Sequence, residues 1–268
     1  MVRLLVLCTR SCLVVGLPIL YTSMKHTMLY LLALVAGLAV LLSGPEATAA
    51  QADFYTSYTD LLQRHVRQGQ VNYKSLSQDR AALQRLVAQV KSYGLKGASA
   101  SEKKAFYLNA YNLLVLQQVL EQYPLKSVMD VKGFFDQKKH TVAGQPMTLN
   151  ELEKQKLLQP YQDARIHFAL VCAAKSCPPL RNEAFTPQQV EQQLQEQAEQ
   201  ALRSNSFIKV QPSKKQVLVS EIFNWYKSDF LREAPSIAAY INRFRAKPLP
   251  AGYSLGYYTY DWQLNDTP

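Results

Sequence analysis

The pattern of hydrophobic and polar positions along the chain predicts mainly helices. Hydrophobic residues recur three or four positions apart over long segments, as they do when one face of a helix packs on a core. The strongest such segment, residues 102–122, follows a capping box at Ser99-Ala100-Ser101-Glu102 and ends before Pro124. The helices predicted in this way are residues 54–66, 79–93, 102–122, 148–158, a helix opened by Thr186-Pro187, 221–231 and 236–246.

Short strands are predicted where alternating residues flank turn residues. Residues 138–148 form one hairpin, and residues 207–210 and 216–219 form a second around residues 211–215. Residues 252–265 form an extended tail rich in tyrosine and tryptophan. Strands and helices do not alternate as they do in a parallel sheet. The expected fold is therefore α+β: a mainly helical single domain with two short β-hairpins and an extended aromatic C-terminal segment.

The first fifty residues follow a different pattern. Residues 28–42 are continuously apolar, follow Lys25 and precede Ala47-Thr48-Ala49-Ala50, small residues suited to signal-peptidase cleavage. This stretch has the length of a signal-peptide core and is shorter than the roughly twenty residues of a membrane span. We expect residues 1–50 to be a signal peptide, with translation starting at Met1 or at Met24, and residues 51–268 to be one periplasmic or secreted domain. The alternative is an uncleaved leader that anchors the protein in the inner membrane.

The charge of the chain is strongly positive, with 30 Lys and Arg residues against 20 Asp and Glu residues, a net charge of +10. Without the first fifty residues, 27 basic and 19 acidic residues remain, a net charge of +8. A basic surface favours an anionic envelope polymer or an acidic peptide as partner. The positive residues are scattered and form no arginine-rich helix, so we expect no nucleic acid partner, and a membrane partner only with an uncleaved leader.

Candidate chemistry concentrates in residues 163–181, DARIHFALVCAAKSCPPLR. An apolar run carries His167 toward the core and ends at Cys172, and a turn then leads to Ser176 and Cys177. Two cysteines in an exported domain pair most often, which predicts a local Cys172–Cys177 disulfide. Such a bond requires residues 173–176 to turn, because a continuous helix would hold the two residues too far apart.

The same stretch also allows a different interpretation, in which His167 activates a nucleophile. A thiolate needs a nearby imidazole, and a third polar group to orient it. Cys177 or Ser176 could fold back toward His167 across the turn, whereas the spacing of Cys172 places it on another face of a helix or strand. This hypothesis makes the protein a cysteine- or serine-type hydrolase or an acyl transferase.

Further polar candidates lie outside this stretch. Asn109 and Asn112 share one face of the predicted helix 102–122, although asparagine is a poor interior helix former. Their amides either tie down a neighbouring loop, or orient a catalytic imidazole or bind a substrate carbonyl. Asp261 lies between two aromatic residues and would need a donor such as Arg165, Arg181 or His167.

Metal ligation is not expected from the histidines and cysteines of the domain. His65, His140 and His167 show no helical ligand spacing, and the Cys-x4-Cys pair has no second pair to complete a zinc site. We therefore expect no metal and no cofactor.

Three motifs follow one another along the chain: Tyr107-Leu108-Asn109-Ala110-Tyr111-Asn112, then His167-Phe168-Ala169-Leu170 with Cys172 and Ser176-Cys177-Pro178, and Tyr260-Asp261-Trp262-Gln263-Leu264-Asn265. In this order they resemble the domain-of-unknown-function 547 family, in its exported bacterial type. The resemblance covers about residues 102–230 and the tail 257–265. It implies one domain, occurrence in exported bacterial and in plant proteins, and attention to Asn112, His167 and Asp261, but no reaction. Plant-type members do not all keep both cysteines, which argues against an obligatory cysteine nucleophile.

Two functions follow from these observations. The first is an exported, non-catalytic binding or scaffold module with a local disulfide, in which Asn109, Cys172 and Arg181 are candidate binding residues. The alternative is a hydrolase or acyl transferase that uses His167 with Cys177 or Ser176, supported by Asn112 and Asp261. The sequence names no substrate or ligand for either function.

Overall fold

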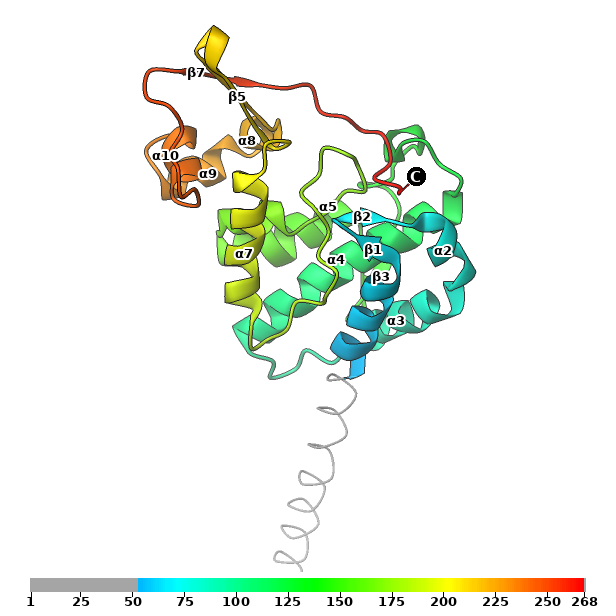
Figure 1. Ribbon diagram of the computed structural model, residues 1–268. Coiled ribbons are helices and arrows are strands. Elements are labelled where there is room, and N and C mark those ends of the chain that lie inside the picture. Colours follow the sequence, from blue (N-terminus) through cyan, green and yellow to red (C-terminus); the bar gives the residue numbers. More distant parts are fainter. Residues whose placement is uncertain (1–52, 268) are drawn as a thin grey trace, which may run out of the picture. The chain divides into compact units, whose positions relative to one another are not determined.

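Helix α4 (Ala100–Gln122) runs through the middle of the domain, and several of the other helices pack against it (Figure 1). The predicted N-cap is present, because the Ser99 hydroxyl accepts a hydrogen bond from the Glu102 N–H at 3.1 Å, and the helix starts at Ala100, two residues before the predicted start. Most of its residues are buried, so apolar side chains face neighbours on several sides rather than along one stripe. The two mid-helix asparagines therefore point into protein and not into solvent.

The computed structural model describes residues 53–267, so the predicted leader lies outside the described residues. Within this range no helix is long and apolar enough to span a membrane. Residues 53–65 are helical, followed by α2 (Tyr73–Gln78), α3 (Arg80–Ser92), α4, η1 (Val128–Asp130), α5 (Leu149–Glu151), η2 (Leu152–Leu158), α6 (Gln159–Tyr161), η3 (Ala164–Phe168), α7 (Val190–Arg203), η4 (Pro212–Lys214), α8 (Ile222–Trp225), α9 (Lys227–Glu233) and α10 (Ile237–Asn242).

Both predicted hairpins are present. Strands β3 (His140–Val142) and β4 (Gln145–Met147) pair antiparallel, and β5 (Ile208–Gln211) pairs with β6 (Gln216–Val219). Two further pairings were not predicted: a hairpin of β1 (Val66–Arg67) with β2 (Gln70–Val71), and a parallel pairing of β7 (Ser254–Tyr257) with β6. Strands of two residues carry no readable alternation, and a parallel partner is not adjacent in sequence. The mainly helical α+β single domain is nevertheless confirmed.

The aromatic tail is extended and crosses the domain after β7, ending near β2 (Figure 1). It makes single bridges at Ser127 with Gln263, Ala174 with Leu264, and Val71 with Asp266. These bridges connect the tail to three segments that are far apart in sequence. The tail thereby holds Tyr260 and Trp262 over the loop that follows η3.

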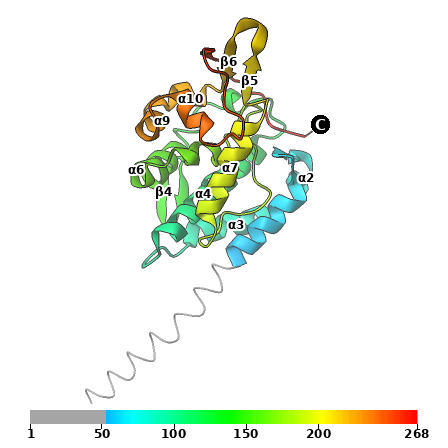
Figure 2. The same ribbon diagram turned by 60° about the vertical axis from the view of Figure 1, so that its left-hand side comes forward.

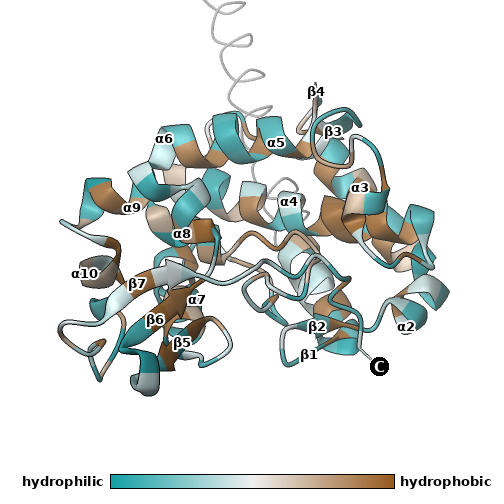
Figure 3. Cartoon of the chain, turned by 90° about the horizontal axis from the view of Figure 1, so that it is seen from above, coloured by the Kyte–Doolittle hydropathy of each residue, from teal (hydrophilic) through white to brown (hydrophobic). Residues whose placement is uncertain are grey.

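The core consists of two hydrophobic clusters. The first surrounds α4 and includes the N-terminal helix and α3, and the second is built from the C-terminal half of α7, β5, β6 and α8 to α10. Cys177 and Trp262 pack against both. Figure 2 shows α7 lying over α4, and Figure 3 shows hydrophobic residues along β5 and β6. The polypeptide between η3 and α7 therefore runs along the boundary of the two clusters.

Several predicted helices differ in detail from the observed ones, and the helix predicted over residues 236–246 ends at Asn242. The segment opened by Thr186 makes a turn first, so that α7 begins only at Val190. The predicted helix 221–231 is broken at Tyr226, where the backbone leaves helical geometry and separates α8 from α9. The helix that starts with the full capping box of Thr148 and Glu151 continues to Tyr161 and contains a π-helical turn, η2.

His140 gives a prediction for acid stability. Its Nε2–H donates to Gln118 Oε1 at 2.8 Å, and burial, assisted by Lys138, lowers its pKa to about 4. An unfolded histidine titrates near 6.5, so the unfolded chain gains a proton between about pH 6.5 and 4 that the folded protein does not bind. We expect urea stability to fall over this window by at most about 3 kcal/mol. His140→Gln keeps a donor to Gln118, and this loss should shrink in that variant; an unchanged loss would contradict the assignment to His140.

Candidate functional site

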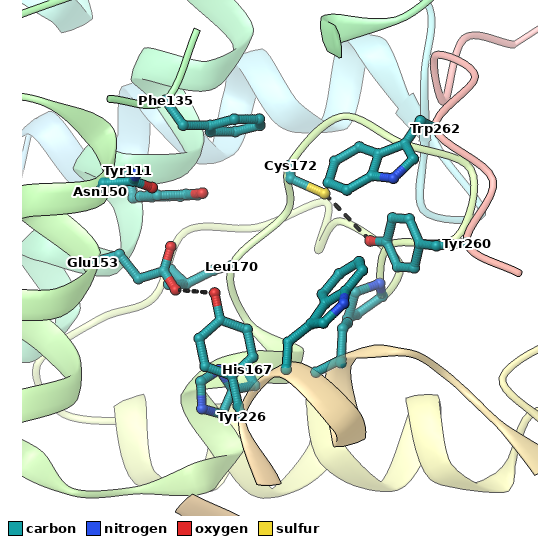
Figure 4. Close-up of a pocket in the computed structure, with 13 residues that line it drawn as sticks. Tyr111, Phe135, Asn150, Glu153, His167, Leu170, Cys172, Tyr226, Tyr260 and Trp262 are labelled. Atoms are coloured by element: carbon teal, nitrogen blue, oxygen red, sulfur yellow. Dashed lines mark hydrogen bonds between the residues drawn. The ribbon is translucent and has the colours of Figure 1, made fainter. Parts of the chain in front are cut away.

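A pocket of about 230 Å³ lies at the boundary of the two hydrophobic clusters (Figure 4). Tyr111 and Leu170 belong to the first cluster, and Ile222 and Tyr260 belong to the second. The pocket is thus formed by segments from both halves of the domain. Its remaining lining residues are Phe135, Asn150, Glu153, His167, Cys172, Pro178, Trp225, Tyr226 and Trp262.

One end of the pocket is acidic. Glu153, on the π-helical turn η2, is only 7% exposed, and its Oε1 accepts a hydrogen bond from the Tyr226 hydroxyl at 2.6 Å (Figure 4). Burial raises the pKa of Tyr226, and the negative charge of Glu153 raises it further, so this tyrosine stays a neutral donor. Tyr111 and Asn150 lie beside Glu153 (Figure 4). Turns of π-helix occur frequently at functional sites.

The other end is aromatic. The rings of Trp225, Tyr260 and Trp262 lie with their centroids 4.8 to 5.9 Å apart. Both tryptophans of the chain are in this group, and Trp225 is 48% exposed although it is large and apolar. An exposed indole beside a concave site is a common feature of binding surfaces.

A disulfide between Cys172 and Cys177 closes the loop behind the aromatic end, as predicted. The Cα atoms are 6.3 Å apart, and the Tyr260 hydroxyl contacts both sulfur atoms, at 3.3 Å and 3.2 Å. Closing a loop between residues five apart stabilises the fold by about 2 kcal/mol in the chain-entropy argument. The bond also removes both thiols from the set of available nucleophiles.

His167 lies under the acidic end of the pocket, on the 3-10 helix η3. It is 5% exposed, and its Nε2–H donates to Asp229 Oδ2 on α9 at 2.8 Å. Its ring packs on the Tyr226 ring, with the centroids 4.0 Å apart. The hydrogen bond from His167 lowers the pKa of Asp229, and Arg232 contributes a second ion pair at 2.8 Å. The imidazole therefore supports the tyrosine that contacts Glu153.

The two asparagines of α4 make hydrogen bonds to backbone groups in the segment 169–185. Asn112 Nδ2–H donates to Ala169 O, and Val171 N–H donates to Asn112 Oδ1, both at 2.9 Å. Asn109 binds Phe185 in the same two-sided way, at 2.7 and 2.9 Å. Each amide thus satisfies two buried backbone groups, and Asn112 fixes the path that leads to Cys172.

The remaining sequence candidates lie elsewhere. Ser176 Oγ accepts from the Asp261 N–H at 2.9 Å, which links the disulfide loop to the tail. The Asp261 carboxylate is exposed and accepts from Gln263 N–H, so none of the three expected donors serves it. Arg181 pairs with Glu183 and Glu196. The structure therefore brings His167 and Cys172 together in the pocket lining, but not Ser176, Asp261 or Arg181.

A second cavity of about 460 Å³ lies on the other side of the disulfide loop. Cys177, Pro179 and Lys175 line it, whereas Cys172 lines the first pocket, and Pro178 contributes to both. Cys177 therefore lines a different cavity from the one lined by His167 and Cys172.

Several residues of the pocket and of its immediate support were not identified from the sequence as site residues. Glu153 and Asp229 lie in charged helical segments that look like solvent-facing surfaces, and Tyr226 looks like one more core aromatic. The break in the helix at Tyr226 places its hydroxyl on Glu153, 73 residues earlier. Within the described residues, no cluster of three or more histidine, cysteine or acidic residues could hold a metal ion.

The fold and pocket define an α+β domain with a small aromatic and acidic pocket that is closed on one side by a disulfide loop. Residues 95–202 match the family model described as "Protein of unknown function, DUF547". That match includes α4, the disulfide loop and α7, while Tyr226, Asp229 and the aromatic tail lie beyond it. Comparisons with curated proteins and with solved structures give no match.

Proposed function

We propose that the protein is an exported, non-catalytic binding module whose pocket holds a small ligand, or one unit of a larger one. The observation that carries this proposal is the pocket itself, which combines exposed aromatic faces with a buried polar end. Ligand sites commonly have this composition, mainly apolar walls with a few fixed polar groups.

The disulfide supports a binding role over a hydrolytic one. A cysteine hydrolase requires a free thiolate near an imidazole, but Cys172 and Cys177 are bonded to each other. Ser176 lies outside the pocket that contains His167, and its hydroxyl oxygen already accepts a hydrogen bond from the Asp261 N–H of the tail. The Nε2 atom of His167, in turn, is held by Asp229. These contacts leave the site with groups that orient a ligand, and without a placed nucleophile among the described residues.

Export is supported by the apolar segment 28–42 and the small residues after it, and by a disulfide, which persists in oxidising compartments. We propose a periplasmic or secreted location for the domain, as for the exported bacterial type of the family. The basic surface would be available there to an anionic envelope polymer. The pocket contains no lysine or arginine among its described lining residues, so such a polymer would contact the outer surface instead.

Intrinsic fluorescence tests the proposed function, because both tryptophans line the pocket. We expect benzyl alcohol, a neutral ring probe, to change the emission of the purified protein in a saturable way. Trp225→Ala should weaken this binding at least about fivefold, since aromatic contacts contribute roughly 1 kcal/mol or more. No turnover of p-nitrophenyl acetate is expected.

Two results would count against the binding module. One is the absence of any saturable fluorescence change. The other is ester hydrolysis that is lost in Ser176→Ala or Cys177→Ser, because it would identify a nucleophile and favour the hydrolase.

A further inference from the structure

Glu153 is a buried carboxylate without a cationic partner. It makes no ion pair with a lysine or arginine of the described chain, and the Tyr226 hydroxyl is its one hydrogen-bond donor there. A carboxylate accepts up to about four hydrogen bonds, and a buried charge is costly unless it is paired. A ligand that brings a positive charge would supply the missing partner.

The surroundings of Glu153 hold it in place for such a contact. It lies on the π-helical turn η2, and Tyr226 reaches it from the break between α8 and α9. Tyr226 is in turn packed on His167, which Asp229 orients. The amide of Asn150, one helical turn before Glu153, makes no hydrogen bond within the described residues and lines the same pocket. A fixed carboxylate and a free amide therefore face one small cavity.

The charge of the pocket is opposite to that of the chain. The chain carries a net charge of +10, yet Glu153 and His167 are the only Asp, Glu, Lys, Arg or His residues among the described lining residues. His167 is already paired with Asp229. The excess charge that remains at this end of the pocket is the negative charge of Glu153.

We propose that this pocket recognises a small ligand with a protonated amine at one end and a ring or other apolar group at the other. Glu153 is the counter-charge for the amine, and Trp225, Tyr260 and Trp262 form the surface for the apolar end. The cavity volume of about 230 Å³ limits the ligand to roughly one ring with a short arm, since typical ligand sites begin at about 300 Å³. The inference rests on the proposed function, because it assigns a ligand class to the same pocket.

Benzylamine and benzyl alcohol separate the two proposals, because they share the ring and differ in charge. We expect benzylamine to bind the unmodified protein about 10- to 100-fold more tightly at neutral pH and low salt, as hydrogen bonds to a charged group are worth more than neutral ones. In Glu153→Gln the preference should fall to within about threefold, mainly because the affinity for benzylamine decreases. N-acetyl-lysine methylamide tests the same chemistry with the amine of a lysine side chain. Tighter binding of benzylamine would identify a free small amine as the ligand, and tighter binding of the lysine derivative would identify a peptide.

Glu151→Gln is the matched control. It makes the same change of charge two residues away, outside the pocket, and glutamine can still complete the cap with Thr148. The benzylamine preference should survive in this variant. Equal affinity of the unmodified protein for benzylamine and benzyl alcohol, or a preference that persists in Glu153→Gln, would overturn the amine proposal and leave the binding module standing. Failure of both probes to bind would overturn the binding module as well.

Discussion

Replacing Asn112 with alanine is expected to destabilise the protein by about 3 to 5 kcal/mol. The amide is 3% exposed and satisfies two backbone groups, Ala169 O and Val171 N–H. A buried backbone group that loses its partner costs roughly 1 to 3 kcal/mol, and the two costs add to that of the space left behind. Urea unfolding measures the change, with an unaltered slope expected if the denatured state is the same.

Asn109→Ala is the comparison that separates folding from binding. Asn109 is equally buried and makes the same pair of bonds, but to Phe185, which does not line the pocket. Both variants should lose similar stability. Only Asn112→Ala should also weaken benzyl alcohol binding, because the segment it holds contains Leu170 and leads to Cys172, which line the pocket.

If Asn112→Ala fails to fold, Asn112→Asp retains the acceptor for Val171 N–H and allows the binding measurement. If the Asn109 and Asn112 variants lost binding equally, the weaker binding would result from a general loosening of the fold and not from a changed path of the segment that Asn112 holds.

Much of the fold could be predicted from local patterns. The period of apolar residues and the caps at Ser99 and Thr148 gave the central helices, because these signals depend on neighbours within one or two turns. The two hairpins were predictable for the same reason. The parallel partner of β6 was not, since β7 begins 35 residues after β6 ends and no local pattern specifies that pairing.

In the candidate site, too, local sequence patterns did not specify partners that lie far apart in the chain. His167, Asn112 and the disulfide were identified because their residue types are unusual in an apolar context. Asp229, the partner of His167, and Glu153, the partner of Tyr226, were not identified, because both are charged residues in helices that resemble ordinary surface helices. Asp229 lies 62 residues after His167, and the structure alone shows that it, rather than Asp261, faces the imidazole. Asp261 looked special between two aromatic residues, but an extended tail lets a carboxylate turn outward to solvent.

Asp229→Ala is expected to cost about 2 kcal/mol and to loosen the acidic end of the pocket. It leaves the buried His167 Nε2–H without an acceptor, and the cost is reduced because Asp229 itself is partly exposed. Tyr226 then loses its fixed support, so the benzylamine preference should decrease although Glu153 is still present. Arg232→Ala is the control. It removes the exposed pair on the other oxygen of Asp229 and should cost less than about 1 kcal/mol without changing the preference.

The pH dependence of stability in a second variant, Asp229→Asn, shows whether the charge of Asp229 is the cause of this loss. The folded pKa of Asp229 is lowered, chiefly by the hydrogen bond from His167, so its contribution to stability is complete above the unfolded value near 3.9. That contribution is lost as the pH falls through the folded pKa, a window more acidic than that of His140. In Asp229→Asn the urea midpoint should therefore depend less on pH below about pH 4. Its dependence on pH between 6.5 and 4 should stay as it is in the unmodified protein. If Asp229→Asn changed the pH dependence between pH 6.5 and 4 and not the one below pH 4, the His167–Asp229 pair would not set acid stability in this protein.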